Sequence, residues 1–492
     1  MPTLPVNVYS VASVREMDRF AIEDHGIPGY TLMTRAGAAA VSAARQRFPD
    51  AARWQIICGA GNNGGDGYVV ARLAASDGVV VSALSLVDPD KLTGDAATAY
   101  QDFSAAGGVV MPWEGDLDSD ANLLVDGILG SGLERDVCGA FGEAVAAINA
   151  HPAPVLALDI PTGIHGDSGK ILGSAVQADL TVTFVGLKSG LFLDDAPSFC
   201  GELVHESLDI PDECVPEVNP VMHRVGESLL VEALAPRRRA AHKGDFGHVL
   251  VIGGGKGMPG AARLCGEAAL RAGAGRVSIA TDPAHAALLT MTRPELMSHA
   301  IEEPKDLERL MVAADVIAFG PGLGRSGWAK SLFDIAQADS RPAVWDADGL
   351  NWLADSPNQA ESRVITPHPG EAGVLLGISA AEVQADRIGA VKALQERHSG
   401  VAVLKGAGTL ISSGAGVPSL CTSGNPGMAA AGMGDALTGI IAAMLAQGLS
   451  AELAAKVGVE VHARAGDIAA RDGERGLIAS DLIAALRAVV NP

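Results

Sequence analysis

The sequence predicts an α/β protein of two domains, each with a mostly parallel β-sheet covered by helices on both faces. Short apolar runs typical of buried strands alternate with helical segments along the chain. The 492 residues are too many for one ordinary core. A composition of 48% hydrophobic and 19% charged residues indicates well-packed globular domains.

The first half begins with apolar residues at helical spacing near residues 10–45. The side chains expected to face inward there are Met17, Phe20, Ala21, Met33, Ala36 and Ala40. Strand-like runs then recur between helical segments, at 55–58, 79–86, 123–126, 155–160 and 180–185. This alternation favours a parallel sheet with helices on both sides.

A segment rich in proline separates the two halves. Residues 210–220 contain three prolines and little periodicity, so we expect one domain over 1–218 and another over 219–492. A second series of strands is expected at 248–252, 276–280, 316–319, 343–346, 364–366 and 401–405, followed by helices to Pro492.

The overall charge limits the partners. With 36 basic and 58 acidic side chains, the net charge is −22, which argues against nucleic acid or an anionic membrane as a partner. The six cysteines are scattered without zinc-type spacing and indicate a reducing compartment. We recognise neither a signal peptide nor an apolar run of about 18 residues, so we expect a cytoplasmic protein. Paired α/β domains often assemble symmetrically, and a homo-oligomer is expected.

A glycine-rich turn stands out in the first half. Residues 59–67 (GAGNNGGDG) follow the strand-like run 54–58 and precede a helical segment at 68–73. A strand, a glycine turn and a helix start place backbone N–H groups where a phosphate can bind. Asn62, Asn63 and Asp66 in the turn indicate a ligand with hydroxyl groups, or a cation. The alternative is a tight turn with Asx caps.

Polar clusters also follow three further strands of this half. They are residues 126–136 (DGILGSGLERD), 159–163 (DIPTG) and 186–190 (GLKSG). Because ligands bind at the carboxyl ends of strands in open α/β sheets, acids and a lysine at consecutive strand ends favour a functional site over simple helix caps.

The glycine turn, DGILGSGLERD and DIPTG together resemble the NAD(P)H-hydrate epimerase family, the N-terminal domain of bifunctional nicotinamide nucleotide repair enzymes, over about residues 10–215. The resemblance implies a Rossmann-like, three-layer αβα domain that inverts C6 of hydrated NADH or NADPH (NADHX, NADPHX). Asp159 would be the acid/base, because loss and return of the C6 hydroxyl require proton transfer to oxygen. Lys188 is a weaker candidate, and it could equally be a surface or ion-pair lysine.

The resemblance also implies the binding residues. The hydrate would contact Asn62, Asn63, Gly64, Gly65, Asp66, Gly130, Ser131, Gly132, Leu133, Glu134, Arg135, Asp136 and Asp159. A potassium ion would be held by Asn63, Asp126 and Thr162.

The second half has its own signature at residues 424–435 (GNPGMAAAGMGD). A glycine-rich turn that opens a helix, with an aspartate in the first turn, is an anion site with an adjacent base. It resembles the ribokinase-like superfamily. Further motifs follow the same pattern: HKG at 242–244, GPGLG at 320–324, DADGL at 346–350, TPHPGE at 366–371 and KGAGT at 405–409.

This set resembles the ADP/ATP-dependent NAD(P)H-hydrate dehydratase over about residues 221–490 and implies a three-layer, ribokinase-like fold. Asp435 as base would let the C6 hydroxyl take the terminal phosphoryl group of ADP, and loss of phosphate would then restore NAD(P)H. Mg²⁺ is expected on the nucleotide phosphates. The hydrate would contact Ala261, Gly322, His368 and Asp435, and the nucleotide Lys405, Gly406, Ala407, Gly408, Thr409 and Gly434.

Some alternatives stay open. His368, beside two prolines, could be a buried loop histidine, and the role of Ala261 could belong to Ala262. A ribokinase-like kinase with an accessory first domain would use the same Asp435, and its product would be a stable phosphate ester. An interaction scaffold is disfavoured because the polar residues of the first-half motifs are all present.

Overall fold

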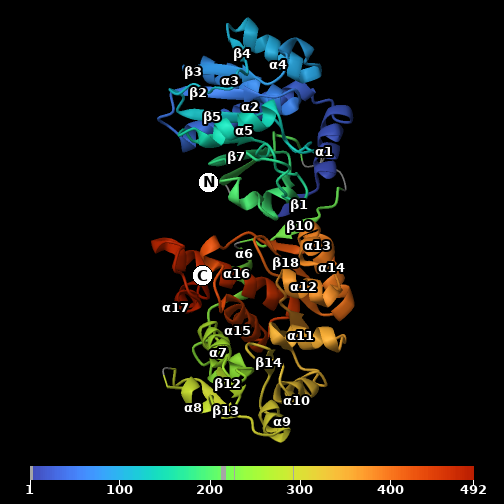
Figure 1. Cartoon of the computed structure of the whole chain (residues 1–492), viewed down its shortest axis with the longest axis vertical. Helices are drawn as coiled ribbons and strands as arrows, with labels where there is room; N and C mark the ends of the chain where they lie inside the picture. The colour runs from blue at the N-terminus through green and yellow to red at the C-terminus, as the bar shows by residue number, and fades with distance from the viewer. Residues whose placement is uncertain (1–3, 212–217, 227, 292) are drawn as a thin grey trace. The chain divides into compact units, whose positions relative to one another are not determined.

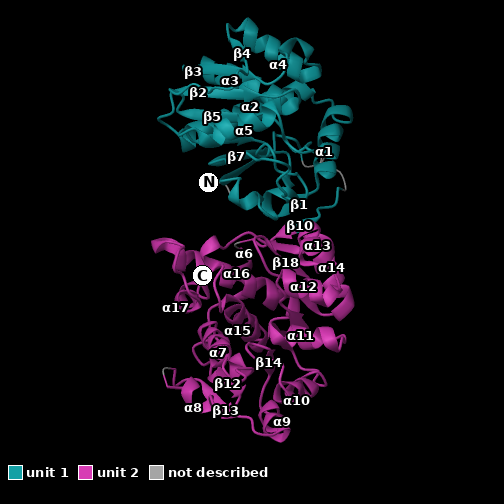
Figure 2. Ribbon diagram, in the orientation of Figure 1, with its two compact units in different colours: residues 1–222 teal, residues 223–492 magenta. Residues whose placement is uncertain are grey.

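The fold is described from a computed structural model, in which residues 4–211, 218–226, 228–291 and 293–492 are placed well enough to describe. The chain divides into two compact units, Met1–Met222 and His223–Pro492 (Figure 2). Residues 212–217 of the proline-rich segment lie outside the described residues.

Unit 1 contains a seven-stranded parallel sheet in the order β4-β3-β2-β5-β6-β7-β9 (Figure 1). Its strands are β2 (Arg53–Cys58), β3 (Val80–Ser85), β4 (Val110–Pro112), β5 (Leu123–Gly127), β6 (Val155–Leu158), β7 (Leu180–Phe184) and β9 (Glu202–Glu206). The five expected strands are confirmed. The two edge strands, β4 and β9, were not expected: β4 has only three residues, and β9 is half-buried with charged residues at both ends. Chain order reverses between β2 and β5, which is where open α/β sheets bind ligands.

Helices cover both faces of this sheet, as the pattern predicts. Ile56 packs under α2 (Gly29–Arg47), α3 (Asn62–Ser76) and α4 (Gly94–Ala105), whereas the next residue, Ile57, packs under α5 (Ala140–Ala150). Successive side chains of a strand point to opposite faces, so apolar runs without alternation are what a sheet buried on both sides requires.

The helical segment near 10–45 is two helices, α1 (Val11–Glu23) and α2. Gly26 adopts a left-handed backbone with φ of 67°, and Pro28 caps α2, so the chain turns between them. The expected inward residues are buried except Phe20, which is half-buried. Before α1, β1 (Asn7–Tyr9) pairs in parallel with β8 (Leu187–Lys188).

Unit 2 contains a sheet in the order β13-β12-β11-β14-β15-β16-β17-β18-β19, and β10 (Met222–Arg224) pairs with β19. The sheet is parallel from β13 to β17, antiparallel between β17, β18 and β19, and parallel again between β19 and β10. Its strands are β11 (His248–Ile252), β12 (Arg276–Thr281), β13 (Met297–Ala300), β14 (Val316–Phe319), β15 (Ala343–Trp345), β16 (Arg363–Ile365), β17 (Val401–Leu404), β18 (Thr409–Ser412) and β19 (Ser419–Cys421). The six expected strands are confirmed, and β13, β18 and β19 are additional.

Two helical layers enclose this sheet as well. One is formed by α7 (Pro259–Arg271), α15 (Met433–Ala446), α16 (Ala451–Ala469) and α17 (Ala479–Val489), whose apolar faces build the main core. On the other face, Phe333 of α10 (Gly327–Ala336) packs against Phe319 and Trp345. The remaining α-helices are α6 (Ser228–Ala233), α8 (Ala286–Leu289), α9 (Pro304–Met311), α11 (Asp348–Asp355), α12 (Pro369–Leu376), α13 (Ala380–Ala385) and α14 (Arg387–His398).

Among the described residues, we find no helix with the length and apolar character needed to span a membrane.

Candidate active sites

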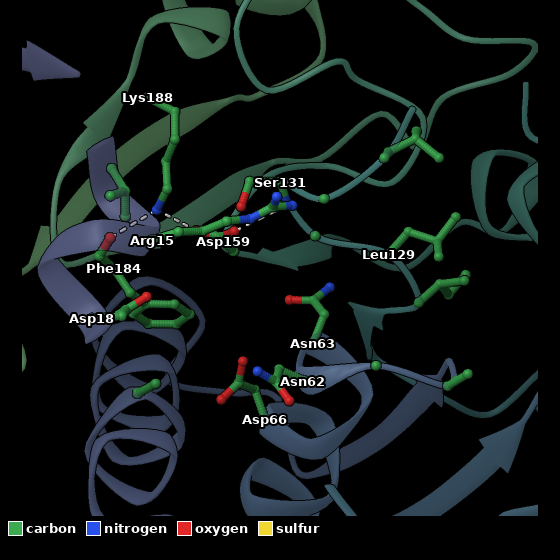
Figure 3. Close-up of a pocket in the computed structure, with 18 of the residues that line it drawn as sticks. Arg15, Asp18, Asn62, Asn63, Asp66, Leu129, Ser131, Asp159, Phe184 and Lys188 are labelled. Carbon is green, nitrogen blue, oxygen red and sulfur yellow. Dashed lines mark hydrogen bonds and ion pairs between the residues drawn. The ribbon is translucent and has the colours of Figure 1, made fainter. Parts of the chain in front are cut away.

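A cavity of about 1160 Å³ lies beside the carboxyl ends of the central strands of unit 1 (Figure 3). It brings together the sequence-predicted residues Asn62, Asn63, Asp66, Gly130–Asp136 and Asp159. Gly64 and Gly65 do not line it. A Cβ at Gly64 would lie 2.2 Å from the Gly59 carbonyl oxygen, and one at Gly65 would lie 2.6 Å from Met33. These two glycines therefore let α3, which forms one wall of the cavity, pack closely against Gly59 and Met33.

The polar residues of the glycine turn are helical. The sequence predicts a turn up to residue 67, but α3 begins at Asn62, with Gly61 as its N-cap. Asn62 and Asp66 are four residues apart and therefore share one helix face. Figure 3 shows their side chains beside Asn63 at the cavity. Backbone N–H groups at a helix start have no helical partner, so this wall can bind an anion.

Asp159 forms a buried ion pair with Lys188. Asp159 follows β6 with φ of 66°, and its Oδ2 accepts a hydrogen bond of 3.1 Å from the Ser131 N–H. Its Oδ1 accepts from Lys188 Nζ. That ammonium also donates to Thr183 Oγ1 at 3.1 Å and to the Phe184 carbonyl at 2.7 Å. Three bonds use all the donors of an ammonium group. Lys188 is thus a buried ion-pair lysine, not a surface one.

The carboxyl groups of the cavity differ in acidity. Burial raises the pKa of Asp159, but Lys188 and the Ser131 hydrogen bond outweigh this effect and leave the pKa below its usual value. Burial raises the pKa of Asp66 well above its usual value, and the nearby Asp159 and Asp18 add to the rise. Burial also raises the pKa of Asp18 to about 6. The cavity therefore holds an ionised carboxylate together with carboxyl groups that retain a proton more readily.

Asp126 and Thr162 do not line the cavity and are joined to each other by hydrogen bonds. Asp126 is fully buried, and its Oδ1 accepts from Thr162 Oγ1 at 2.7 Å and from the Ile128 N–H at 3.1 Å. Its Oδ2 accepts from the Thr162 N–H at 2.8 Å. Burial raises the pKa of Asp126 to about 6, against these hydrogen bonds. The contacts tie the end of β5 to the loop after β6.

Asn63, the third residue of the predicted cation site, makes no direct bond to that pair. Its side chain is buried, and neither amide atom has a hydrogen-bond partner among the described residues. A Cβ at Gly130 would lie 3.3 Å from Asn63 Oδ1 and 3.2 Å from Asp159 Oδ2. A buried amide without a partner is costly, so this group is suited to a ligand that the chain alone does not provide.

Sequence reasoning missed the contribution of α1. Arg15 and Asp18 line the cavity, three residues apart on one helix face. Val14 and Met17, at helical spacing beside them, are buried, and this spacing was the signal in the sequence.

A second cavity, of about 550 Å³, lies in unit 2 around the start of α15. It brings together the predicted residues His368, Lys405, Gly406, Gly434 and Asp435. The other predicted nucleotide residues, Ala407, Gly408 and Thr409, and the predicted hydrate residues Ala261 and Gly322 do not line it.

Ala261 and Gly322 nevertheless face one another. A Cβ at Gly322 would lie 2.9 Å from that of Ala261, whereas Ala262 is fully buried in the core. Of the two neighbouring alanines, Ala261 is therefore the one placed against the GPGLG loop.

Asp435 is the residue of this cavity best suited to act as a base. It lies in the first turn of α15, after Gly432 with φ of 90°. Burial raises its pKa to about 7, with Asp346 adding to the rise and Lys405 opposing it. A carboxyl group that titrates near neutrality can take a proton efficiently at physiological pH.

Asp346 and Glu371, which sequence reasoning left without a role, hold Lys405. Lys405 Nζ lies 2.7 Å from Asp346 Oδ1 and 3.7 Å from Glu371 Oε2. Thr438 donates to Asp346 Oδ2 at 2.9 Å. Asp346 directly follows β15, and this position at a strand end was the signal in the sequence that could have indicated a role for it.

His368 is not a buried loop histidine. It caps α12, where its Nδ1 accepts from the N–H groups of Gly370 at 3.0 Å and Glu371 at 3.2 Å. Its side chain is 57% exposed, and its Nε2 lies 3.6 Å from Glu371 Oε1.

Comparisons with known proteins match both units. A family model described as YjeF-related protein N-terminus matches residues 29–190, and one described as NAD(P)H-hydrate dehydratase matches residues 249–487. The chain is 47% identical over 486 residues to the bifunctional NAD(P)H-hydrate repair enzyme Nnr of Coxiella burnetii, covering 99% of both chains. It is 42% identical over 491 residues to the Escherichia coli protein of the same name, covering 100% of this chain and 95% of that one. A solved ribokinase-like superfamily protein from Enterococcus faecalis is 30% identical, with a TM-score of 0.51 over 54% of this chain and 94% of its own.

Proposed function

This chain belongs to the family of bifunctional NAD(P)H-hydrate repair enzymes, and we propose which of its residues perform the two reactions. The enzyme epimerises the R and S hydrates of NADH and NADPH at C6. It also dehydrates the S hydrate to NAD(P)H, with ADP converted to AMP and phosphate. We assign the epimerase to residues 1–218 and the dehydratase to 219–492.

The Asp159–Lys188 pair carries the epimerase assignment. The hydrate's phosphates would bind the N–H groups at the start of α3 and in the loop 130–136, and its ribose hydroxyls would meet Asn62 and Asp66. This places the nicotinamide ring against Asp159. A carboxylate held ionised by Lys188 stabilises the cationic ring formed when the hydroxyl leaves, and it can take a proton from the returning water.

A potassium ion would be held by Asn63, Asp126 and Thr162. The unpartnered Asn63 amide supports this proposal, because one carboxylate among neutral oxygens suits a monovalent cation better than calcium or magnesium. The ion would tie the start of α3 to two strand ends and hold the phosphate-binding N–H groups in place.

The potassium proposal is tested on the full chain by replacing KCl with choline chloride at constant ionic strength. We expect epimerisation to fall and the melting temperature of unit 1 to drop. The dehydratase of unit 2, assayed with S hydrate at saturating ADP, shows whether the effect is confined to unit 1. A flat response of both epimerisation and melting temperature would discard the ion.

Asp435 carries the dehydratase assignment. Its carboxylate takes the proton of the C6 hydroxyl as that oxygen attacks the terminal phosphoryl group, and expulsion of phosphate then restores the dihydronicotinamide ring. The hydrate would contact Ala261, Gly322 and His368. The nucleotide would bind Gly434 and the loop 405–409, whose Lys405 offsets phosphate charge. Mg²⁺ on the nucleotide would supply further charge neutralisation.

The experiment that tests both assignments starts from hydrated NADH containing both epimers. With ADP and Mg²⁺, we expect absorbance of the dihydronicotinamide to return for nearly all of the hydrate. If recovery stops near the initial S fraction, after correction for spontaneous epimerisation, the epimerase assignment is wrong.

We also infer a cytoplasmic enzyme that forms a homo-oligomer. All five cysteines in the described part of the chain are free thiols, which supports a reducing compartment. Light scattering after size-exclusion chromatography measures the assembly.

A further inference from the structure

Helix α1 contributes a cavity wall that lies outside the matched family model. The matched family model begins at residue 29, after α1 ends at Glu23. The outer charges of α1 pair with one another: Arg19 lies 4.0 Å from Glu16 and 3.1 Å from Glu23. Asp18 instead lines the cavity of unit 1.

Inversion at C6 needs two groups that move protons. One must protonate the leaving hydroxyl, and the other must take a proton from the water that returns on the opposite face of the ring. Lys188 holds the pKa of Asp159 below its usual value, so in this direction of the reaction Asp159 is suited to be the base. The Lys188 ammonium is engaged by Asp159, Thr183 and Phe184, so it is poorly placed to act as the acid.

Two further carboxyl groups face this pair. Asp66 projects from α3 beside Asn62, where the dinucleotide is expected to lie, and Asp18 projects from α1 beside Phe184 (Figure 3). Burial raises the pKa of both carboxyl groups, that of Asp18 to about 6. An efficient acid titrates near the working pH, which favours Asp18.

We propose that Asp18 is the second catalytic residue of the epimerase and works from the α1 wall as the partner of Asp159. This inference rests on the proposed epimerase function of unit 1. The C6–O bond breaks as the Asp18 carboxyl proton passes to the leaving oxygen, while the lone pair of the ring nitrogen forms a C6=N1 double bond. Water then adds to the other face of C6 and gives its proton to Asp159, and the nitrogen regains its lone pair.

The two carboxyl groups exchange roles in the reverse direction. After one inversion Asp18 is ionised and Asp159 is protonated, and a proton returns through water. The charged groups that face Asp18 are Lys188, Asp159 and Asp66. The active form holds one proton between Asp18 and Asp159. Epimerisation should therefore fall as the pH rises through the pKa of Asp18, when both groups become ionised.

Asp18→Asn tests the proposal in the full chain. The reaction mixture contains no ADP, so the dehydratase is inactive, and the interconversion of R and S hydrate is followed by chromatography. We expect kcat to fall by at least ~10²-fold, with KM nearly unchanged, and the alkaline limb of the pH profile to disappear. Glu16→Gln, on the outer face of the same helix, is the matched control and should behave as the wild type.

Other outcomes separate this proposal from the underlying function. If the wild type does not interconvert the hydrates, the proposed function fails and not the role of Asp18. If Asp18→Asn stays within about threefold of the wild type, or loses activity with an unchanged pH profile, Asp18 is not the acid. If Asp18→Asn melts at a lower temperature, Asp18→Glu decides the point. Recovered activity with a shifted alkaline limb supports the proposal, and no recovery overturns it.

Discussion

At the scale of single residues, the pKa values of two aspartates in similar surroundings are shifted in opposite directions. Asp159 and Asp435 both lie in polar cavities, and burial raises the pKa of each. Lys188 bonds directly to Asp159 and overcomes that effect. In unit 2, the corresponding cation, Lys405, bonds to Asp346, whose negative charge pushes the pKa of Asp435 further upward. In each unit, the carboxyl group that bonds directly to the lysine is therefore the one whose pKa is lowered.

The raised pKa of Asp435 predicts the pH dependence of dehydration. Asp435 must be ionised to act as a base, and its pKa is about 7, so kcat/KM should rise with pH between about 6 and 8. Asp435→Asn should lower dehydration by at least ~10²-fold and flatten this profile, while ADP binding and epimerisation are retained.

The exposed Asp472 provides the control for that substitution. Asp472→Asn should leave both the rate and the pH profile unchanged. Loss of both activities in Asp435→Asn would instead indicate misfolding or a shared site.

At the scale of elements, the start of α3 depends on how closely it approaches the end of β2. Gly64 lies against the backbone of Gly59, and only a residue without a Cβ fits there. Glycine is a poor helix former, so tertiary packing and not helix propensity explains why the helix begins as early as Asn62.

Gly64→Ala should therefore disable unit 1. Its Cβ would meet the Gly59 carbonyl oxygen at 2.2 Å, and backbone must move to relieve the overlap. We expect a loss of roughly 1–3 kcal/mol of unfolding free energy, or more, and loss of epimerisation. Differential scanning calorimetry measures the first effect and the hydrate assay the second.

Gly61→Ala is the matched control for the melting temperature. Nothing lies within 4 Å of a Cβ at Gly61, so this variant should melt close to the wild type. Equal melting of the two variants would contradict the close-packing argument.

At the scale of the whole molecule, the two sites are built within separate units. Each unit has its own sheet and its own cavity, and every residue proposed for a reaction comes from a single unit. The reactions should therefore be separable by mutation, with the S hydrate released between them.

Mixing two variants, each of which lacks one of the two activities, tests that independence. Asp159→Asn alone should stop at the initial S fraction, and Asp435→Asn alone should form no NADH. Their mixture should recover nearly all of the hydrate, because one protein epimerises and the other dehydrates. Recovery no greater than with Asp159→Asn alone would mean that both steps must occur within one chain.

The sequence by itself determined the fold class and predicted the location of both candidate sites. Buried parallel strands are local apolar runs, and the glycines and acids at their ends are contiguous motifs, so residues 59–67, 126–136 and 424–435 were recognisable directly. The edge strands β4 and β9 were not predicted, because β4 has only three residues and the half-buried β9 lacks an apolar run.

Only the tertiary structure decided which groups are charged and which partners they have. Lys188 meets Asp159 across 29 residues of sequence, Thr162 meets Asp126 across 36, and Lys405 meets Asp346 across 59. The entry of Asp18 into the cavity is likewise a result of how α1 packs. A carboxyl group's pKa depends on burial and on charges within a few ångströms, and these are fixed only when distant parts of the chain come together.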